Sequence, residues 1–195
     1  MIISSMSTSA NIPAYILCGG KSSRMGSEKG LVKFQEKQFI HHIINVLKKI
    51  TNFVFLVTEN QEYLSFELEL LKDNYKGKGP LGGIQTALNH TLNKKALILS
   101  CDIPLITVDA LNTLLQNTKS DAEISFATAD ENWHPLVGIY AKSLLPVMEN
   151  DIENDRLKLI DFIKKHRYQE IEIADSKSLT NINSPEELKQ LEQIK

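Results

Sequence analysis

The sequence has few of the features that mark extracellular, membrane-spanning or nucleic-acid-binding proteins. Its 195 residues include two cysteines, Cys18 and Cys101, which are too few for a disulfide-stapled scaffold. No apolar run approaches the roughly 20 residues of a membrane-spanning helix. The formal net charge is −2, so no overall charge attracts nucleic acid or an anionic membrane. We therefore expect a cytoplasmic protein with reduced thiols and a small-molecule substrate.

The N-terminus also lacks a recognisable export signal. Residues 1–11 begin with apolar side chains but have no cationic start and no long apolar core, which a signal peptide needs. We expect a flexible arm there. A chain of this length makes one ordinary domain, so we predict a single domain over residues 12–195.

Two common phosphate-binding patterns are missing. Gly20-Lys21-Ser22 resembles the end of a P-loop, but that motif needs a glycine five residues before Gly20, where Tyr15 stands. The dinucleotide-binding pattern G-x-G-x-x-G also fails, because Gly19 and Gly20 are adjacent and lysine follows. Any phosphate loop here is consequently of a third kind.

A candidate for such a loop lies near the N-terminus. A short apolar run, Tyr15 to Cys18, ends in Gly19-Gly20, and cationic side chains follow at Lys21, Arg24 and Lys29. Glycines let backbone N–H groups approach an anion closely, and the cations neutralise its charge. The alternative is a surface turn with solvated lysines.

Apolar periodicity predicts alternating strands and helices along most of the chain. We expect strands where the apolar residues are continuous or alternate, and helices where they recur with helical spacing. Such alternation predicts an α/β fold, a three-layer, mostly parallel, Rossmann-like sheet with helices on both faces. The expected strands are 14–18, 52–58, 67–72, 95–100, 122–127, 135–140 and 168–174, and the expected helices are 38–50, 61–66, 81–92, 107–117, 142–150, 156–166 and 185–194.

In such sheets ligands bind at the carboxyl ends of the strands. The loops after Cys18, Thr58, Lys72 and Ser100 should therefore meet at one edge. Asp102 follows a buried strand there, close to the candidate phosphate loop. Mg²⁺ prefers one or two carboxylates together with substrate phosphates, so Asp102 is a candidate magnesium ligand. The alternative is that Asp102 only caps a turn.

Three further motifs have open interpretations. Gly82 and Gly83 stand at a helix start, where bare backbone could contact a base or a phosphate, or could simply form the turn. His134 precedes a strand, in a polar segment expected to be an exposed turn. Asn181 and Asn183 have amides two residues apart, which point the same way on an extended segment or form Asx turns.

Taken together and in this order, these motifs resemble the molybdenum cofactor guanylyltransferase family, part of a wider nucleotidyltransferase superfamily. The resemblance extends from about Ile12 to Leu191. The first motif alone marks only the superfamily, and the combination with the closing Asn-Ile-Asn-Ser-Pro-Glu is more specific. The matching segments are Leu17–Gly26 with Lys29, Gly79–Gly83, Cys101–Pro104, His134–Tyr140 and Asn181–Leu188.

The resemblance implies transfer of GMP from GTP to molybdenum-bearing molybdopterin, with Mg²⁺, in the cytoplasm. The products would be the guanine dinucleotide form of the cofactor and pyrophosphate. Proteins that deliver the cofactor and apo-molybdoenzymes that receive it would be further partners. Rival readings are a cytidylyltransferase for the same pterin, a sugar-phosphate nucleotidyltransferase, or a non-catalytic nucleotide sensor.

The resemblance also implies roles for single residues. Those assigned to GTP are Leu17, Cys18, Gly19, Gly20, Lys21, Lys29, Thr58, Asp73, Gly82 and Asp102. Lys29, Arg24 and Asp102 would be catalytic, with Asp102 as the metal ligand, and Asn181 and Asn183 would bind the acceptor. The sequence departs from the family at Cys18, where alanine is usual, and at Thr58, where an asparagine is expected.

Overall fold

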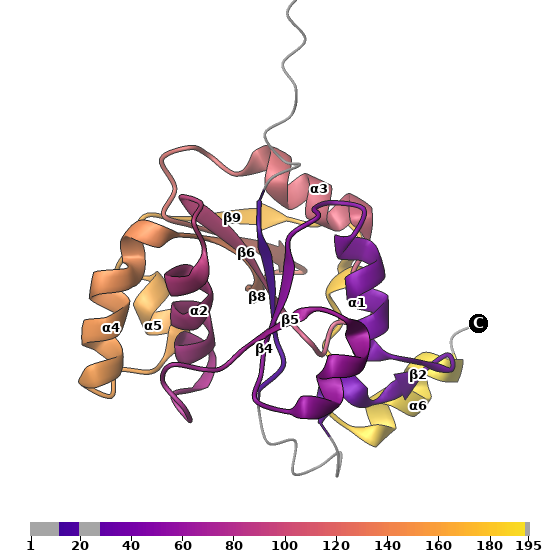
Figure 1. Cartoon of the computed structure of the whole chain (residues 1–195). Coiled ribbons are helices and arrows are strands. Elements are labelled where there is room, and N and C mark those ends of the chain that lie inside the picture. Colours follow the sequence, from indigo (N-terminus) through magenta and orange to yellow (C-terminus); the bar gives the residue numbers. More distant parts are fainter. Residues whose placement is uncertain (1–11, 20–27, 194–195) are drawn as a thin grey trace, which may run out of the picture.

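The computed structural model describes residues 12–19 and 28–193. Its centre is a seven-stranded sheet in the order β5-β4-β1-β6-β8-β7-β9 (Figure 1). The predicted flexible arm and the residues Gly20, Lys21 and Arg24 lie outside the described ranges. The sheet strands are β1 (Ala14–Leu17), β4 (Val54–Val57), β5 (Glu69–Leu71), β6 (Lys95–Ser100), β7 (Ile124–Ala129), β8 (Asn132–Ala141) and β9 (Tyr168–Glu172).

The strand directions confirm the predicted, mostly parallel fold. β5, β4, β1 and β6 are parallel neighbours, and β8 is antiparallel to both β6 and β7. In register, Leu17 lies opposite both Val57 and Ser100. The loops after β1, β4, β5 and β6 therefore leave the same edge of the sheet, as expected for a ligand-binding edge.

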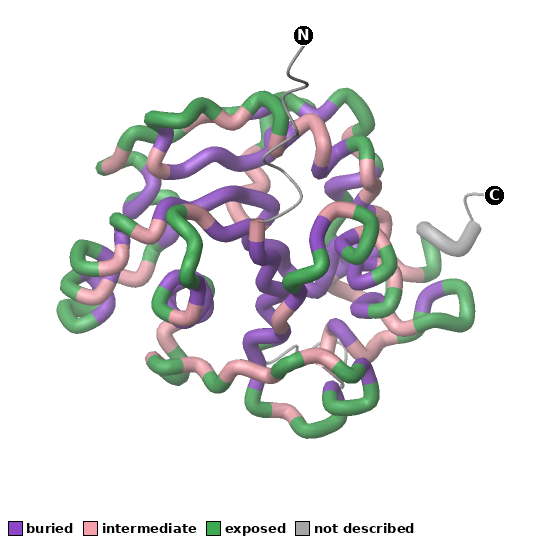
Figure 2. The backbone as a smooth tube through the Cα atoms, turned by 45° about the horizontal axis from the view of Figure 1, so that its top comes forward, coloured by how far each residue is buried: buried purple, intermediate pink, exposed green. Residues whose placement is uncertain are grey.

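Helices cover both faces of the sheet (Figure 1). Side chains alternate across a strand, so Tyr15 and Leu17 of β1 pack in the core with α2, α4 and α5, whereas Ile16 and Cys18 pack with α1 and α3. Figure 2 shows the central strands buried and the outer loops exposed. The helices are α1 (Phe39–Leu47), α2 (Gly79–His90), α3 (Val108–Asn117), α4 (Leu145–Glu153), α5 (Leu159–Ile163) and α6 (Pro185–Gln193), with 3-10 turns η2 (Lys29–Leu31), η3 (Gln61–Phe66), η4 (Lys142–Leu144) and η5 (Ser176–Leu179).

Two of the predicted helices begin with side-chain caps. The Thr107 hydroxyl accepts a hydrogen bond from the Ala110 amide at 3.2 Å at the start of α3. Before α6, the Ser184 hydroxyl accepts a hydrogen bond from the backbone N–H of Glu187 at 3.2 Å. The Glu187 carboxylate accepts one from the backbone N–H of Asn183 at 2.6 Å. These reciprocal bonds satisfy amide groups that a helix start leaves unpaired, and they fix the chain just after Asn183.

Several boundaries differ from the predictions. The expected exposed turn before residue 135 is confined to Asp130 and Glu131, both with left-handed φ values of 49° and 64°, so β8 already begins at Asn132. Residues 33–38 form a small hairpin, β2 (Lys33–Phe34) with β3 (Lys37–Gln38), which was not predicted. The expected helix 156–166 is helical only over α5. Phe53, expected inside a buried strand, precedes β4 and is 48% exposed.

No helix in the described ranges is long and apolar enough to cross a membrane.

Candidate active site

Three distant segments meet beside the end of β6. The Lys29 ammonium donates to the Asp102 carboxylate at 2.9 Å and to the Asn183 side-chain oxygen. The Asn181 amide also donates to Asp102, at 2.8 Å. We call Lys29, Asp102, Asn181 and Asn183 the carboxylate cluster. It joins residues up to 154 positions apart in the chain.

Asp102 lies deeper than predicted. A residue in a loop at the ligand-binding edge would ordinarily be exposed to solvent, but Asp102 is only 8% exposed. Its carboxylate also accepts from the Ser100 hydroxyl at 2.5 Å, and its backbone oxygen accepts from the Ile182 amide at 2.9 Å. The second bond pins the Asn181–Asn183 segment against the β6 end. A buried carboxylate needs such partners, and together they fix the direction in which it points.

Lys29 is placed to bind an anion. Its side chain is 24% exposed, against 12% for that of Asp102, so the pair is partly shielded from solvent. A lysine ammonium has three donor hydrogens, and Asp102 and Asn183 account for two of them. Within the described residues this leaves one donor for an incoming phosphate oxygen.

The described part of the predicted phosphate loop lies beside this cluster. Leu17 supports the start of α2, because a Cβ added at Gly83 would lie 3.2 Å from its methyl groups. Gly19 is exposed, and a Cβ there would meet nothing within 4 Å, which leaves its backbone accessible. Gly20, Lys21 and Arg24 lie outside the described residues, so their assignments stay predictions.

The other predicted nucleotide residues form a second group on the same edge. The buried Thr58 hydroxyl accepts from the Asn60 amide at 3.1 Å, and Asp73 accepts from the Tyr75 amide at 2.9 Å. Burial raises the pKa of Asp73, and its bonds to Tyr75 and Thr86 oppose that rise. A Cβ at Gly82 would lie 2.8 Å from the Tyr75 carbonyl oxygen. Gly82 thus has a packing reason for being glycine, and its nucleotide contact stays a prediction.

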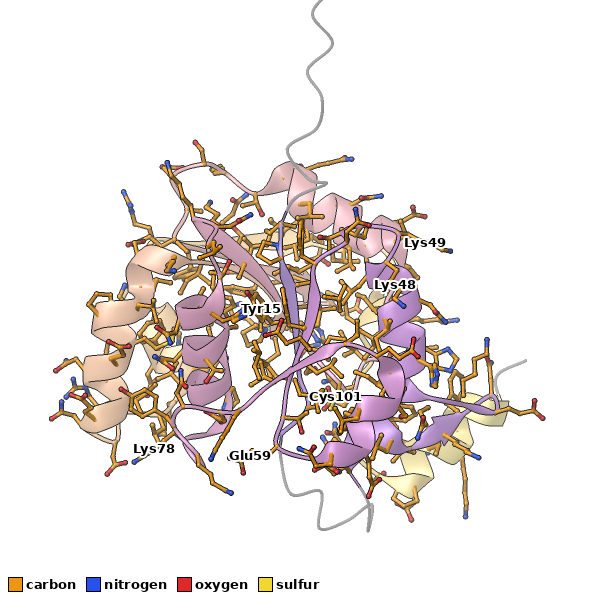
Figure 3. The ribbon with its side chains drawn as sticks, in the orientation of Figure 1. Tyr15, Lys48, Lys49, Glu59, Lys78 and Cys101 are labelled. Atoms are coloured by element: carbon orange, nitrogen blue, oxygen red, sulfur yellow. The ribbon has the colours of Figure 1, made fainter. Side chains whose placement is uncertain are left out.

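Charged side chains are found at both ends of the sheet. Figure 3 shows Glu59, Lys78 and Cys101 toward the lower end, and Lys48 and Lys49 toward the upper end. Lys78 pairs with Asp155 at 2.5 Å and Glu59 pairs with Lys76 at 2.6 Å. These exposed pairs lie at the ligand-binding edge, whereas Lys48 and Lys49 follow α1 at the opposite edge.

A pocket of about 450 Å³ adjoins the carboxylate cluster. This volume suits a small-molecule ligand. Ser100 and Asn181 contribute polar groups, whereas most of the wall is apolar and comes from β8 and α5. The apolar wall includes Trp133, Pro135, Leu136, Val137, Leu159 and Ile160.

His134 also lines this pocket, contrary to the prediction of an exposed turn residue. It is half-buried within β8. Burial lowers the pKa of its imidazole, and the nearby Asn181 amide acts in the opposite direction. Burial therefore favours the neutral form of the ring. Sequence reasoning also missed Ser100, Trp133 and the pocket residues of α5, because a serine or an apolar residue carries no motif by itself.

The donor set fits a magnesium ion that relies on its substrate. Asp102 supplies a carboxylate and Asn183 presents an amide oxygen, which are the kinds of oxygen ligand that Mg²⁺ accepts, whereas Asn181 turns its NH2 group toward Asp102. Among residues 12–19 and 28–193, no group of three or more His, Cys, Asp or Glu side chains could hold a metal. The remaining ligands would then have to be phosphate oxygens and water, as Mg²⁺ commonly takes them.

Comparisons with known proteins agree on one family. The family model described as "MobA-like NTP transferase domain" matches residues 14–170. A Flavobacterium johnsoniae protein named "Probable molybdenum cofactor guanylyltransferase" is 47% identical, covering 92% of this chain and 96% of the relative. A "Molybdenum cofactor guanylyltransferase" from Shewanella sp. strain MR-4 is 34% identical, covering 94% and 96%.

A solved structure extends the agreement to the fold. The molybdopterin-guanine dinucleotide biosynthesis protein A of Archaeoglobus fulgidus aligns with a TM-score of 0.80 at 25% identity, covering 94% of this chain and 98% of that one. The range matched by the family model includes the β1 loop and the β6 end, and the alignments with the two relatives cover 92% and 94% of this chain. The protein is therefore a nucleotidyltransferase and belongs to the molybdenum cofactor guanylyltransferase family.

Proposed function

We propose that this chain transfers GMP from GTP to molybdopterin bearing molybdenum, forming the guanine dinucleotide cofactor and releasing pyrophosphate. The observation that carries the proposal is the contact of Lys29 with Asp102 at the carboxyl ends of β1 and β6. A cation and a carboxylate held there suit a nucleoside triphosphate. We take the nucleotide, GTP, and the acceptor, the molybdenum cofactor, from the names of the relatives, which are guanylyltransferases for that cofactor. We place the reaction in the cytoplasm.

The chemistry requires mainly charge cancellation and alignment. An acceptor phosphate oxygen attacks the α-phosphorus of GTP, and both groups are anionic. Lys29 contributes positive charge from a fixed position, and we assign Lys21 and Arg24 to the same task. Mg²⁺, when bound at Asp102, would further neutralise the phosphate oxygens. The attacking phosphate oxygen is already ionised at neutral pH, so it carries no proton that a general base would have to remove. We therefore assign no catalytic role to His134.

We assign the apolar pocket to the pterin of the acceptor. A flat heterocycle can pack against Trp133 and Leu159, and its polar edge can face Asn181 and Ser100. The nucleotide would lie on the β1 side of Asp102, near Gly19 and Asp73. The two substrates would then meet at the carboxylate cluster, where in-line attack needs them.

A product assay with each nucleotide tests the proposed function. Purified protein, molybdenum-bearing molybdopterin and Mg²⁺ are incubated with GTP, CTP or ATP, and pyrophosphate and the dinucleotide product are measured. We expect product with GTP. A preference for CTP would make the chain a cytidylyltransferase. Turnover only in parallel reactions that contain a sugar phosphate instead of molybdopterin would show that the proposed acceptor is wrong. Nucleotide binding without product for any acceptor would leave a nucleotide sensor.

Replacing the paired asparagines tests the division of the site. The double variant Asn181→Ala and Asn183→Ala is expected to raise KM for the acceptor about tenfold or more, because each lost hydrogen bond contributes roughly 0.5–1.5 kcal/mol. GTP affinity, measured by calorimetry without acceptor, should change less. Asn150→Ala, an exposed position on α4, is the control.

Single variants separate the two asparagines. Asn183 also accepts a hydrogen bond from Lys29. Any loss of GTP affinity in the double variant should therefore be reproduced by Asn183→Ala alone. Asn181→Ala should change the acceptor KM alone. Lost GTP affinity with an unchanged acceptor KM in the double variant would move both residues to the nucleotide side.

A further inference from the structure

The two cysteines lie side by side beneath the candidate active site. β1 and β6 pair in register as far as Leu17 opposite Ser100, and Cys18 and Cys101 are the residues that directly follow the two strands. The Cys101 amide donates to the Leu17 carbonyl at 3.3 Å, so the strands are still hydrogen-bonded there. Both thiols belong to the core on the α1 side of the sheet. They are therefore neighbours on one face.

The backbone at this point suits a disulfide. Neighbouring strands lie about 4.7–4.9 Å apart, and disulfide-bonded cysteines have Cα atoms about 4.4–6.8 Å apart. Cys18 and Cys101 are 3% and 6% exposed, and both are free thiols. The whole sequence holds no third cysteine, so within one chain this is the pair that can be linked.

Two buried polar groups, the Tyr63 hydroxyl and the Glu28 carboxylate, lie near the thiols. Tyr63 is fully buried, and neither its hydroxyl nor the Glu28 Oε2 atom has a hydrogen-bond partner in the structure as described. A Cβ at Gly30 would lie 2.5 Å from the Tyr63 oxygen and 3.3 Å from the Cys101 Cβ. Buried groups of this kind are costly.

Burial keeps the Cys18 thiol protonated in the reduced protein. Desolvation raises the pKa of Cys18, and the neighbouring Cys101 and Glu28 add to that rise, whereas the Tyr63 hydroxyl opposes it. The thiolate is the reactive form, so oxidation that begins at Cys18 will be slow and will need a persistent oxidant. Disulfide formation takes seconds to hours in proteins.

We propose that Cys18 and Cys101 form a reversible disulfide under peroxide and that this disulfide inactivates the enzyme. One sulfur, as its thiolate, attacks a peroxide oxygen and becomes a sulfenic acid. The displaced hydroxide takes the thiol proton and leaves as water. The second thiol attacks the sulfenic sulfur, forms the S–S bond and releases a second water. The two thiols lose two electrons and two protons, and hydrogen peroxide is reduced to water.

Inactivation follows from the residues that come next in the chain. Cys18 immediately precedes Gly19, and Cys101 immediately precedes Asp102. Formation of the S–S bond brings the two sulfurs into covalent contact, so both cysteine side chains must turn toward each other and the core directly behind Gly19 and Asp102 must repack. Displacement of a reacting group by about 1 Å can cost 10²-fold in rate. This step rests on the proposed function, whereas disulfide formation does not.

Peptide mapping and activity measured on the same samples test the proposal. Reduced full-length protein is treated with hydrogen peroxide, free thiols are alkylated, and proteolytic peptides are analysed by mass spectrometry without reduction. We expect a Cys18–Cys101 linked peptide, a loss of GMP transfer of at least about tenfold, and recovery of both thiols and activity with dithiothreitol. Cys101→Ala, which keeps every assigned binding residue, should retain activity through the same treatment, and Cys101→Ser replaces it if the alanine variant folds poorly.

The readouts distinguish the possible failures. Absence of the linked peptide, or linkage between two chains, overturns the disulfide. A linked peptide with unchanged activity overturns the inactivation. Equal loss of activity in Cys101→Ala assigns peroxide damage to other residues and also overturns it. If the reduced protein transfers no GMP, the proposed function fails, and the linked peptide still decides whether the disulfide exists.

Discussion

Replacing Asp102 with asparagine is expected to lower the turnover of GMP transfer by at least about 10²-fold, the scale of losing several kcal/mol of charge stabilisation. Asparagine keeps the size of the side chain and one acceptor oxygen but removes the negative charge. Lys29 then loses its ion-pair partner, and the proposed metal ligand is gone. The measurement is steady-state pyrophosphate release at saturating GTP and Mg²⁺.

Burial of Asp102 makes asparagine a better test than alanine. Three side-chain donors, from Ser100, Lys29 and Asn181, point at this carboxylate. Alanine would remove the shared acceptor of all three, although Lys29 would keep its bond to Asn183, and a buried group without a partner costs about 1–3 kcal/mol. Lost activity could then reflect poor folding. Thermal unfolding of each variant separates the two effects.

Asp121→Asn is the matched control for Asp102→Asn. Asp121 is exposed between α3 and β7, far along the sheet from the carboxylate cluster. The same chemical change there should leave turnover within twofold or so, as surface substitutions usually do. Near-normal turnover of Asp102→Asn in saturating Mg²⁺ would remove Asp102 from its assigned role.

The sheet could be predicted because its information is local. β1 is apolar at every position and buried on both faces, and a continuous apolar run of this kind is typical of a parallel strand. The predicted strand order along the chain then placed Cys18 and Ser100 at one edge. Motifs identified Lys29, Asp102, Asn181 and Asn183 one at a time, and the structure added that they touch.

The burial of Asp102 and the pocket could not be predicted in the same way. Asp102 is covered by Ser100 and by the segment around Ile182, about 80 residues later in the chain. The pocket joins β8 to α5, and no local pattern in either segment identifies the other. Asp130 and Glu131 form the turn between β7 and β8 with left-handed φ values. Such two-residue turns are usually recognised by Asn-Gly or Asp-Gly, and neither pair is present here. The early start of β8, which brings Trp133 and His134 into the pocket, was therefore hidden.

Replacing Lys29 with alanine is expected to weaken transition-state binding by roughly 2–4 kcal/mol, the scale for losing one preorganised electrostatic contact. This corresponds to a fall in kcat/KM of about 30-fold to several hundred-fold. Lys29 should contact phosphate both in the bound nucleotide and in the transition state, so GTP affinity and turnover should both fall. Calorimetric titration with GTP and steady-state kinetics measure the two quantities separately.

Two further variants decide whether position matters as well as charge. Lys49→Ala removes the same charge from an exposed site at the opposite end of the sheet (Figure 3), and should change neither quantity. Lys29→Arg restores the charge but replaces a compact ammonium with a planar guanidinium, which cannot reproduce both the Asp102 and Asn183 contacts in the same space, so recovery should be partial. Asp102 remains bonded to Ser100 and Asn181 in all of them, so folding should survive.

Unchanged GTP affinity and rate in Lys29→Ala would mean that this lysine only balances the charge of the buried carboxylate. The phosphate contact would then have to come from elsewhere in the loop.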